Sequence, residues 1–519
     1  MRELALCIVC VSNTCPSGVD GFIRALRDHR LPPRRVDARS SGSGGRNGGA
    51  HGGKLVFVSS TNWIVTAVLD RYESGHPAPR QGCVFRRSEI LAPGHSAGRT
   101  PVARMFSDLI RIEGWRPKRT LVFAAWDGAE FGQVGSTEFV QKHAGELDQR
   151  VVAYISLDRA ITGNRTLQVM GSPLLRQVLS EAAEQVPEVG TLDGDDEGGG
   201  GGQTRPDKAD MSQRRTPPVG RSAPPGPLQS PPTLYASWAR RGTLRPSSVR
   251  NPRPEMSPPA GGCADLLPFG QLLGTSTAHV QLVARDGRSD YPAARTAYDD
   301  LDYLTEHTDP GQNAAAALAQ LVAAASLALV DSLRLPVRVT DYAEQISADF
   351  STFQRQHGEF FRSNHLRMDV LAAAVRAFAV ACKEFQDEYE GLAKDQQTFT
   401  PAVIAEHNDR VLQLERNFLL PAGYPRHPHQ RHLIYGPDNE DESRGALFPH
   451  LVVAIRQARK RPISPAISYV RENHSLVLHA LRSAAAVLDR SLLRASETSP
   501  QPALPLSTAQ EPSHESLET

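Results

Sequence analysis

Residues 120–140 (TLVFAAWDGAEFGQVGSTEFV) and residues 151–158 (VVAYISLD) decide how this chain folds. In each stretch an apolar run is followed by an acidic residue, Glu130 in the first and Asp158 in the second. Nearly continuous apolar runs are typical of strands that are buried on both faces of a parallel sheet. Because ligands and metals collect beyond the carboxyl ends of such strands, two acidic side chains at adjacent strand ends predict a cation site.

Helical and extended segments alternate around these two strands. Residues 102–112 have helical apolar spacing, and a second helix begins at residues 136–143. A further strand is expected over residues 166–170, followed by a helix over residues 174–183. This order implies strands joined by helical crossovers, so we predict an α/β domain over residues 90–310.

The C-terminal part of the chain has a different pattern. Residues 313–333 are rich in Ala and Leu, and helical apolar spacing returns in residues 370–390, 403–418 and 475–493. We therefore predict an all-α domain over residues 311–496, whose helices pack on each other or on a partner.

Three segments have the composition of disordered chain. Residues 33–53 and 190–232 are rich in Gly, Ser, Pro and charged residues, and the tail over residues 497–519 is similar. Such segments bury too little apolar surface to offset the loss of chain entropy on folding. We expect residues 1–89 to be a partly disordered N-terminus and residues 190–232 to be a flexible insert in the α/β domain.

The charge balance and hydropathy exclude some classes of partner. The chain has 58 Lys and Arg against 57 Asp and Glu, a formal net charge of +1, so we expect no nucleic-acid partner. We expect no membrane-spanning segment, because no run approaches the roughly 20 apolar residues that span a bilayer. The apolar run of residues 4–11 is short and preceded only by Arg2, so neither an anchor nor a clear signal peptide is predicted.

Several short segments, in collinear order, resemble the glutamate carboxypeptidase II family. This family includes the N-acetylated alpha-linked acidic dipeptidase-like proteins and the transferrin receptors. The resemblance covers about residues 90–185 and 232–490, whereas residues 1–89 are unmatched. The segments are EGWRPKRT (113–120), WDGAEFGQVGSTEF (126–139), VAYISLD (152–158), GNRTLQV (163–169), SPL (172–174), LYASW (234–238), YPAARTAYDDLDYL (291–304), LPVRVTDYAE (335–344), NDRVLQLERNF (408–418) and RHLIYGP (431–437).

The resemblance implies both an architecture and an assembly. We expect a zinc-peptidase-like, mostly parallel sheet flanked by helices, followed by a transferrin-receptor-like helical dimerisation domain and hence a homodimer. Relatives of this type are usually extracellular and membrane-anchored, so an extracellular or membrane-associated location is expected. Asn164 and Asn473 begin Asn-X-Ser/Thr triplets and are candidate glycosylation acceptors.

The zinc chemistry of the family is incomplete in this chain. Active members hold two zinc ions with a bridging Asp, two terminal His, a terminal Glu and a terminal Asp, and a second Glu is the general base. Glu130 matches the terminal Glu ligand and Asp158 the terminal Asp ligand. The base position falls on Ala129, which accepts no proton. One His position falls on Arg295, whose permanent charge repels zinc.

The remaining zinc ligands of the family fall near Gly82 and Ala92, where the match is poor. Two oxygen ligands do not make a tetrahedral zinc site of the usual kind. Glu130 and Asp158 are therefore interpreted either as hydrogen-bonding groups at strand ends, one of them paired with Arg295, or as a residual metal site.

The positions that recognise glutamate in the family also differ. Its arginine patch falls on about His279 and Gln281, and its Lys-Tyr pair falls on Glu442 and Ser443. A glutamate carboxylate would find few cations here.

Two functions follow from these substitutions. The first is a non-catalytic, receptor- or scaffold-like homodimer that binds a peptide or protein ligand. The alternative is a co-catalytic zinc exopeptidase, a carboxypeptidase or dipeptidase, whose upstream ligands are missing from the gene model.

Overall fold

The computed structural model describes part of the chain. The described residues are 6–10, 55–58, 67–68 and 101–489, the last range without 125, 127–131, 149, 190–231, 242, 245–252, 262–264, 285–290, 294–295, 297, 299–300, 395–399, 425–426 and 442–443. Ala129, Glu130 and Arg295 therefore lie outside the described residues. The segments predicted to be disordered, 33–53, 497–519 and nearly all of 190–232, lie outside them too.

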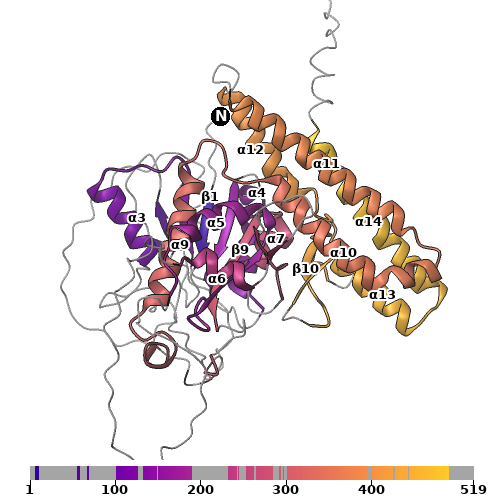
Figure 1. Ribbon diagram of the computed structural model, residues 1–519, viewed down its shortest axis with the longest axis horizontal. Helices are drawn as coiled ribbons and strands as arrows, with labels where there is room; N and C mark the ends of the chain where they lie inside the picture. The colour runs from indigo at the N-terminus through magenta and orange to yellow at the C-terminus, as the bar shows by residue number, and fades with distance from the viewer. Residues whose placement is uncertain are drawn as a thin grey trace, which may run out of the picture.

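A seven-stranded mixed sheet forms the centre of the N-terminal part, with the strand order β3-β2-β4-β1-β5-β9-β6 (Figure 1). The four inner strands, β4, β1, β5 and β9, are parallel to one another, and the outer strands pair antiparallel. The prediction of a mostly parallel sheet thus holds for the inner strands only. The strands are β1 (Leu6–Cys10), β2 (Leu55–Val58), β3 (Ala67–Val68), β4 (Thr120–Ala124), β5 (Val151–Ser156), β6 (Thr166–Gly171) and β9 (Ser276–Val283).

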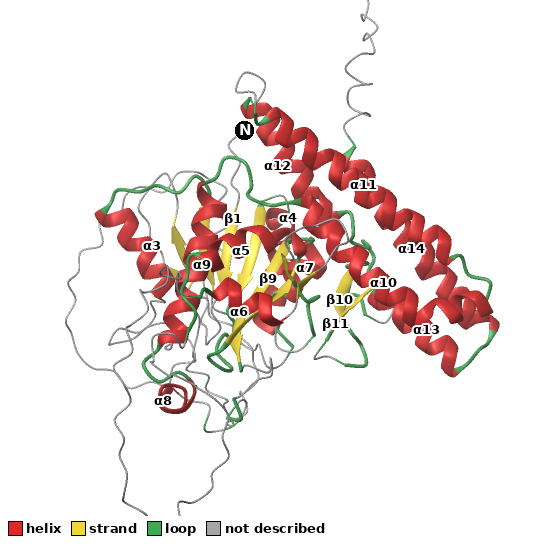
Figure 2. Ribbon diagram, viewed as in Figure 1, coloured by secondary structure: helices red, strands yellow, loops and turns green. Residues whose placement is uncertain are grey.

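Helices cover both faces of this sheet (Figure 2). Side chains alternate along a strand, so in β4 Leu121 and Phe123 enter one apolar cluster while Val122 and Ala124 enter the other. The first cluster includes residues of the helices α3, α5, α6 and α9, and the second includes residues of α4 and α7. Their bounds are α3 (Pro101–Ile112), α4 (Val134–Leu147), α5 (Arg176–Glu184), α6 (Leu234–Arg241), α7 (Leu267–Leu273) and α9 (Asn313–Asp331).

Helix α9 belongs to this α/β arrangement, although the sequence placed it at the start of the helical domain. It packs against α5, α3 and the strands β1, β4 and β9. By length and composition α9 could cross a membrane, contrary to the expectation from the sequence, but 67% of its most apolar window is buried inside the fold. Its apolar character is accounted for by its place on the sheet.

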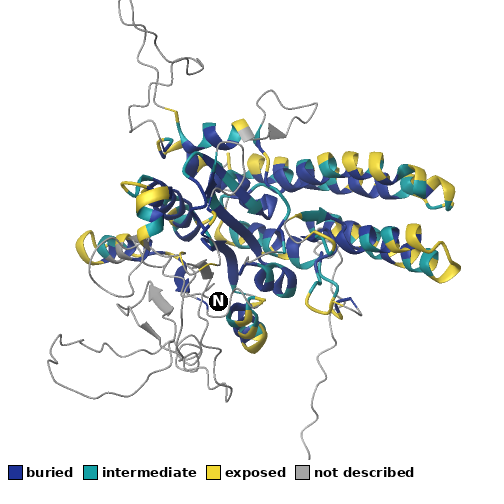
Figure 3. Ribbon diagram, turned by 90° about the horizontal axis from the view of Figure 1, so that it is seen from below, coloured by how far each residue is buried: buried dark blue, intermediate teal, exposed yellow. Residues whose placement is uncertain are grey.

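The C-terminal part is helical, as predicted, and projects from the sheet, with exposed residues along the outer faces of its helices and at their far ends (Figure 3). Helix α10 was not predicted, and α14 begins earlier than expected because Ser464 and Pro465 start it. The helices are α10 (Val339–Ser363), α11 (Met368–Leu392), α12 (Pro401–Arg416), α13 (Pro449–Lys460) and α14 (Ser464–Leu488). The shorter elements are β7 (Thr243–Leu244), β8 (Arg253–Pro254), β10 (Tyr435–Pro437), β11 (Gly445–Leu447), α8 (Leu301–Tyr303), the 3-10 turn Pro173–Leu175 and the π turn Leu304–Thr308.

A buried carboxylate joins the helical part to the α/β part. Glu415 of α12 is 4% exposed and accepts hydrogen bonds from three donors. Ser172, which follows β6, donates its hydroxyl, Tyr342 of α10 donates from Oη at 3.2 Å, and His432 donates from Nε2 at 2.8 Å. Four segments that are distant in the sequence therefore meet at one side chain.

A second buried connection lies beside it. Arg176 of α5 is fully buried and donates to the backbone oxygen of Asp341 at 3.1 Å and to Gln345 Oε1 at 2.5 Å. The Asp341 carboxylate, also fully buried, pairs with Arg253. These bonds fix α10 against the α/β part.

Candidate functional site

Asp158 lies directly beyond the carboxyl end of β5, as predicted, and is 5% exposed. Its backbone N–H donates to Ser156 Oγ at 3.2 Å. Its backbone oxygen accepts a hydrogen bond from His279 Nε2 at 2.5 Å, which ties the end of β5 to β9. Arg159, the next residue, has a φ of 46°, and beyond it Ile161 forms a bridge with Leu282, so the chain continues beside β9.

Trp126 positions the chain where β4 ends. Its Nε1 donates to Tyr154 Oη at 2.9 Å, and its ring centroid lies 4.9 Å from that of Phe139 in α4. No role was predicted for Trp126, although its place just after a buried strand was a usable signal.

The two acidic residues do not follow neighbouring strands. Strand β1 lies between β4 and β5, so the strand ends that lead to Glu130 and Asp158 are two strand spacings apart, roughly 10 Å. The expectation of adjacent strand ends is thus wrong. It failed because residues 6–10 were not recognised as a strand of the sheet.

The two positions that match the family's arginine patch carry no cation at neutral pH. Burial lowers the pKa of His279 to about 4, so its imidazole is neutral at pH 7. Gln281 donates through Nε2 to Gln168 Oε1 at 3.0 Å, across the antiparallel pair β6 and β9. Glu442 and Ser443 lie outside the described residues.

Two family models match this chain. The model described as "Peptidase family M28" matches residues 97–222, and the model described as "Transferrin receptor-like dimerisation domain" matches residues 366–489. Together they identify the α/β part and the helical part in the order that the fold shows.

Curated relatives give the same result. Aminopeptidase NAALADL1 of Mus musculus is 28% identical over 391 residues, 75% of this chain and 46% of the relative. Probable glutamate carboxypeptidase LAMP1 of Arabidopsis thaliana is 25% identical over 386 residues, 74% of this chain and 47% of the relative. The glutamate carboxypeptidase 2 homolog of Caenorhabditis elegans is 25% identical over 400 residues, 73% of this chain and 46% of the relative.

These matches support the glutamate carboxypeptidase II-like family, which the sequence resembles. The chain spans about half the length of the curated relatives that it matches.

Zinc is the metal that the likeness to the M28 peptidases implies, and the described residues alone do not fit a zinc pair. Among them, no group of three or more His, Cys, Asp or Glu side chains is arranged to hold a metal ion. Of the positions matched to the family's zinc ligands and general base, only Asp158 is described. The roles of Ala129, Glu130 and Arg295 therefore stay predictions from the sequence.

The two candidate glycosylation acceptors have different surroundings. Asn164 is half-buried in the turn before β6. Asn473 is 1% exposed within α14, and its Nδ2 donates to the backbone oxygen of Tyr469 at 2.9 Å. Glycan attachment needs a surface position, so this burial weighs against Asn473, and Asn164 stays a prediction.

Proposed function

We propose that this protein is a non-catalytic, receptor- or scaffold-like homodimer that keeps the fold of the M28 peptidases without their hydrolytic centre. The observation that carries the proposal is Ala129, which stands at the position of the family's general base inside a segment that otherwise matches. A methyl side chain accepts no proton, so the water that attacks a peptide carbonyl would lack its base.

Two further observations support the loss of catalysis. Arg295 stands where the family has a zinc-binding histidine, and a guanidinium neither coordinates nor tolerates a divalent cation. The glutamate-recognition positions are also altered, because His279 is neutral and Gln281 is bonded to Gln168. A peptide or protein ligand would therefore bind this surface through contacts other than those that hold a terminal glutamate.

Metal content and peptidase turnover, measured on the purified full chain, test this proposal. We expect well under one equivalent of zinc per chain and no hydrolysis of dipeptides. About two equivalents of zinc together with turnover would refute it. The double variant Ala129→Glu/Arg295→His is expected to stay inactive, because it does not supply the ligands that fall near Gly82 and Ala92.

The second candidate is a co-catalytic zinc exopeptidase with a disrupted upstream sequence. It is favoured by Glu130 and Asp158, which match two ligand positions, and by relatives named as an aminopeptidase and as glutamate carboxypeptidases. Sequencing the transcript upstream of Arg99 separates the two candidates. An in-frame segment with a histidine and an Asp-Pro would support the enzyme, although Ala129 and Arg295 would still need an explanation.

The homodimer is proposed to form through the helical part. Residues 366–489 match the transferrin receptor-like dimerisation domain, and two copies of one helical surface can meet around a two-fold axis. Sedimentation at micromolar concentration tests this assembly, and a clean monomer would contradict it. An extracellular or membrane-associated location is proposed with it, and a mass shift on deglycosylation that is lost in Asn164→Gln would support that location.

A further inference from the structure

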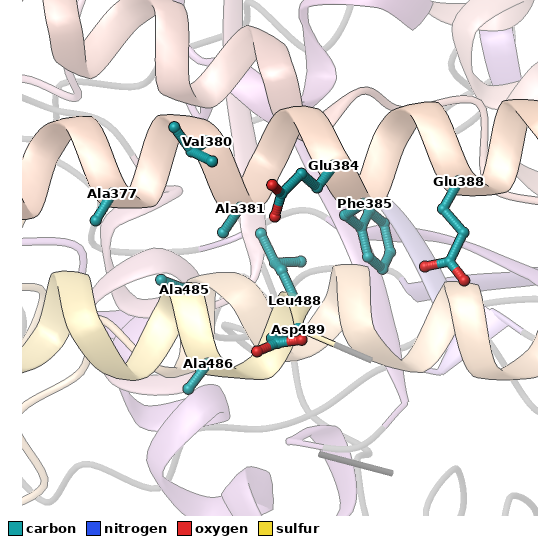
Figure 4. Close-up of a pocket in the computed structure, with 10 residues that line it drawn as sticks. All are labelled: Ala377, Val380, Ala381, Glu384, Phe385, Glu388, Ala485, Ala486, Leu488 and Asp489. Carbon is teal, nitrogen blue, oxygen red and sulfur yellow. The ribbon is translucent and has the colours of Figure 1, made fainter. Parts of the chain in front are cut away.

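A groove of about 570 Å³ lies between α11 and the C-terminal end of α14 (Figure 4). Its apolar lining includes the buried side chains of Phe385 and Leu488 and also Val380, which is 54% exposed. An apolar side chain of this size that remains exposed beside an apolar hollow gains stability when another apolar group covers it.

The rim of the groove is acidic. Glu384 and Glu388 of α11 and Asp489 at the end of α14 are among the ten lining residues, and none of the ten is basic. The groove therefore matches an occupant that combines apolar side chains with positive charge and carries no acidic residue.

The position of the groove relative to the chain narrows the choice of occupant. Helix α11 continues past the end of α14, so that Glu388 lies beyond Asp489 along the same direction (Figure 4). The described chain ends at Asp489, and residues 490–519 follow. The groove thus opens at the place where the remaining residues begin.

We propose that residues 490–496 (RSLLRAS) of the same chain bind in this groove. Helix α14 ends at Leu488, and the backbone of Asp489 is extended (φ −80°, ψ 114°), so the chain leaves the helix beside Ala485 and Ala486, which both line the groove. Leu492 and Leu493 follow within four residues and supply two apolar side chains for the groove.

Charge and tethering agree with this occupant. The segment carries Arg490 and Arg494 and no acidic residue, which complements the carboxylates of the rim. Leu492 stands three residues after Asp489, a reach of up to roughly 10 Å, so the segment is long enough to enter the groove, which Asp489 itself lines. Because a short tether gives an effective concentration on the order of millimolar, the segment would outcompete a free partner at micromolar concentration.

Hydrogen exchange measured by mass spectrometry on the full chain tests this proposal. The variant Leu492→Asp/Leu493→Asp is expected to speed exchange of the α11 amides in residues 380–388 by about tenfold. The matched control Leu504→Asp/Leu506→Asp places the same substitutions further along the same tail and is expected to change nothing there. Peptides from β5 report whether a variant has lost its fold as a whole.

A charge exchange gives an independent readout with variants that leave the apolar contacts intact. Arg490→Glu/Arg494→Glu is expected to speed exchange in residues 380–388, and adding Glu384→Lys/Glu388→Lys is expected to restore slow exchange. Unchanged exchange in both the leucine and the arginine variants would overturn the proposal. Protection that rises with protein concentration would also overturn it, because the occupant would then come from another molecule.

Discussion

Replacing Glu415 with alanine should destabilise the whole chain more than any substitution at the surface. The carboxylate is 4% exposed and accepts hydrogen bonds from Ser172, Tyr342 and His432. Alanine removes all three bonds at once. It leaves three donors, from three different segments, without their acceptor in a place that excludes water.

The size of the effect follows from those donors. A buried donor that loses its partner costs roughly 1–3 kcal/mol, and bonds to a charged acceptor lie at the upper end of that range. Rearrangement around the smaller side chain recovers part of the loss, so we expect about 3–5 kcal/mol for Glu415→Ala. Ser172→Ala removes a single donor and leaves the carboxylate two bonds, and we expect about 1 kcal/mol.

Urea unfolding of the full chain, followed by circular dichroism, measures these changes. Glu359, an exposed residue of α10, provides the matched control, and Glu359→Ala is expected to change the free energy of unfolding by less than about 0.5 kcal/mol. If Glu415→Ala lay within about 1 kcal/mol of the unmodified protein, the assignment of Glu415 as a buried link between the two parts would be refuted.

Further predictions concern four single sites. Burial raises the pKa of Asp349 to about 6, so the folded state holds its proton more tightly than the unfolded state does. The resulting stability is complete below about pH 4 and is lost as the pH rises to 6, so Asp349→Asn should flatten the pH dependence of the free energy of unfolding in that window by roughly 2 kcal/mol. Gly171 has a φ of +138°, and an added Cβ would lie 2.1 Å from the backbone oxygen of Thr277, so Gly171→Ala should cost roughly 3 kcal/mol in a thermal melt. Gly358→Ala, in an open helical position, should instead stabilise by about 0.5–1 kcal/mol. Burial raises the pKa of the Cys382 thiol, and we expect iodoacetamide to label Cys382 only after denaturation, as measured on its tryptic peptide.

The strands and helices that a local pattern specifies were predicted from the sequence. Strands β4 and β5 are continuous apolar runs, and both lie inside the stretches of residues 120–140 and 151–158 that predicted them. Strand β1 was missed because its five apolar residues carry no local signal of where they pair. Their partners in β4 and β5 lie more than a hundred residues further along the chain. The antiparallel direction of β6 was missed for the same reason, since it is set by its pairing with β9.

The candidate site was also predicted only in part from the sequence. Asp158 was placed correctly at the end of β5, because the continuous apolar run that predicts the strand ends just before this residue. The neutral state of His279 depends on its complete burial and could not be derived from the residues around it in sequence. The cluster at Glu415 depends on four segments, and only the folded chain brings them together.

The continuity of the core determines how dimerisation would affect stability. One apolar cluster runs from Val102 in α3 through α9 to Leu488 in α14. The hydrogen bonds of Glu415 and Arg176 also join the α/β part to the helical part. The helical part therefore has no core of its own that could unfold while the sheet stays intact. If the dimer forms through residues 366–489, association stabilises the entire chain by mass action. A single unfolding transition whose midpoint rises with protein concentration is expected, and two transitions, of which only one depends on concentration, would show that the two parts are energetically separate.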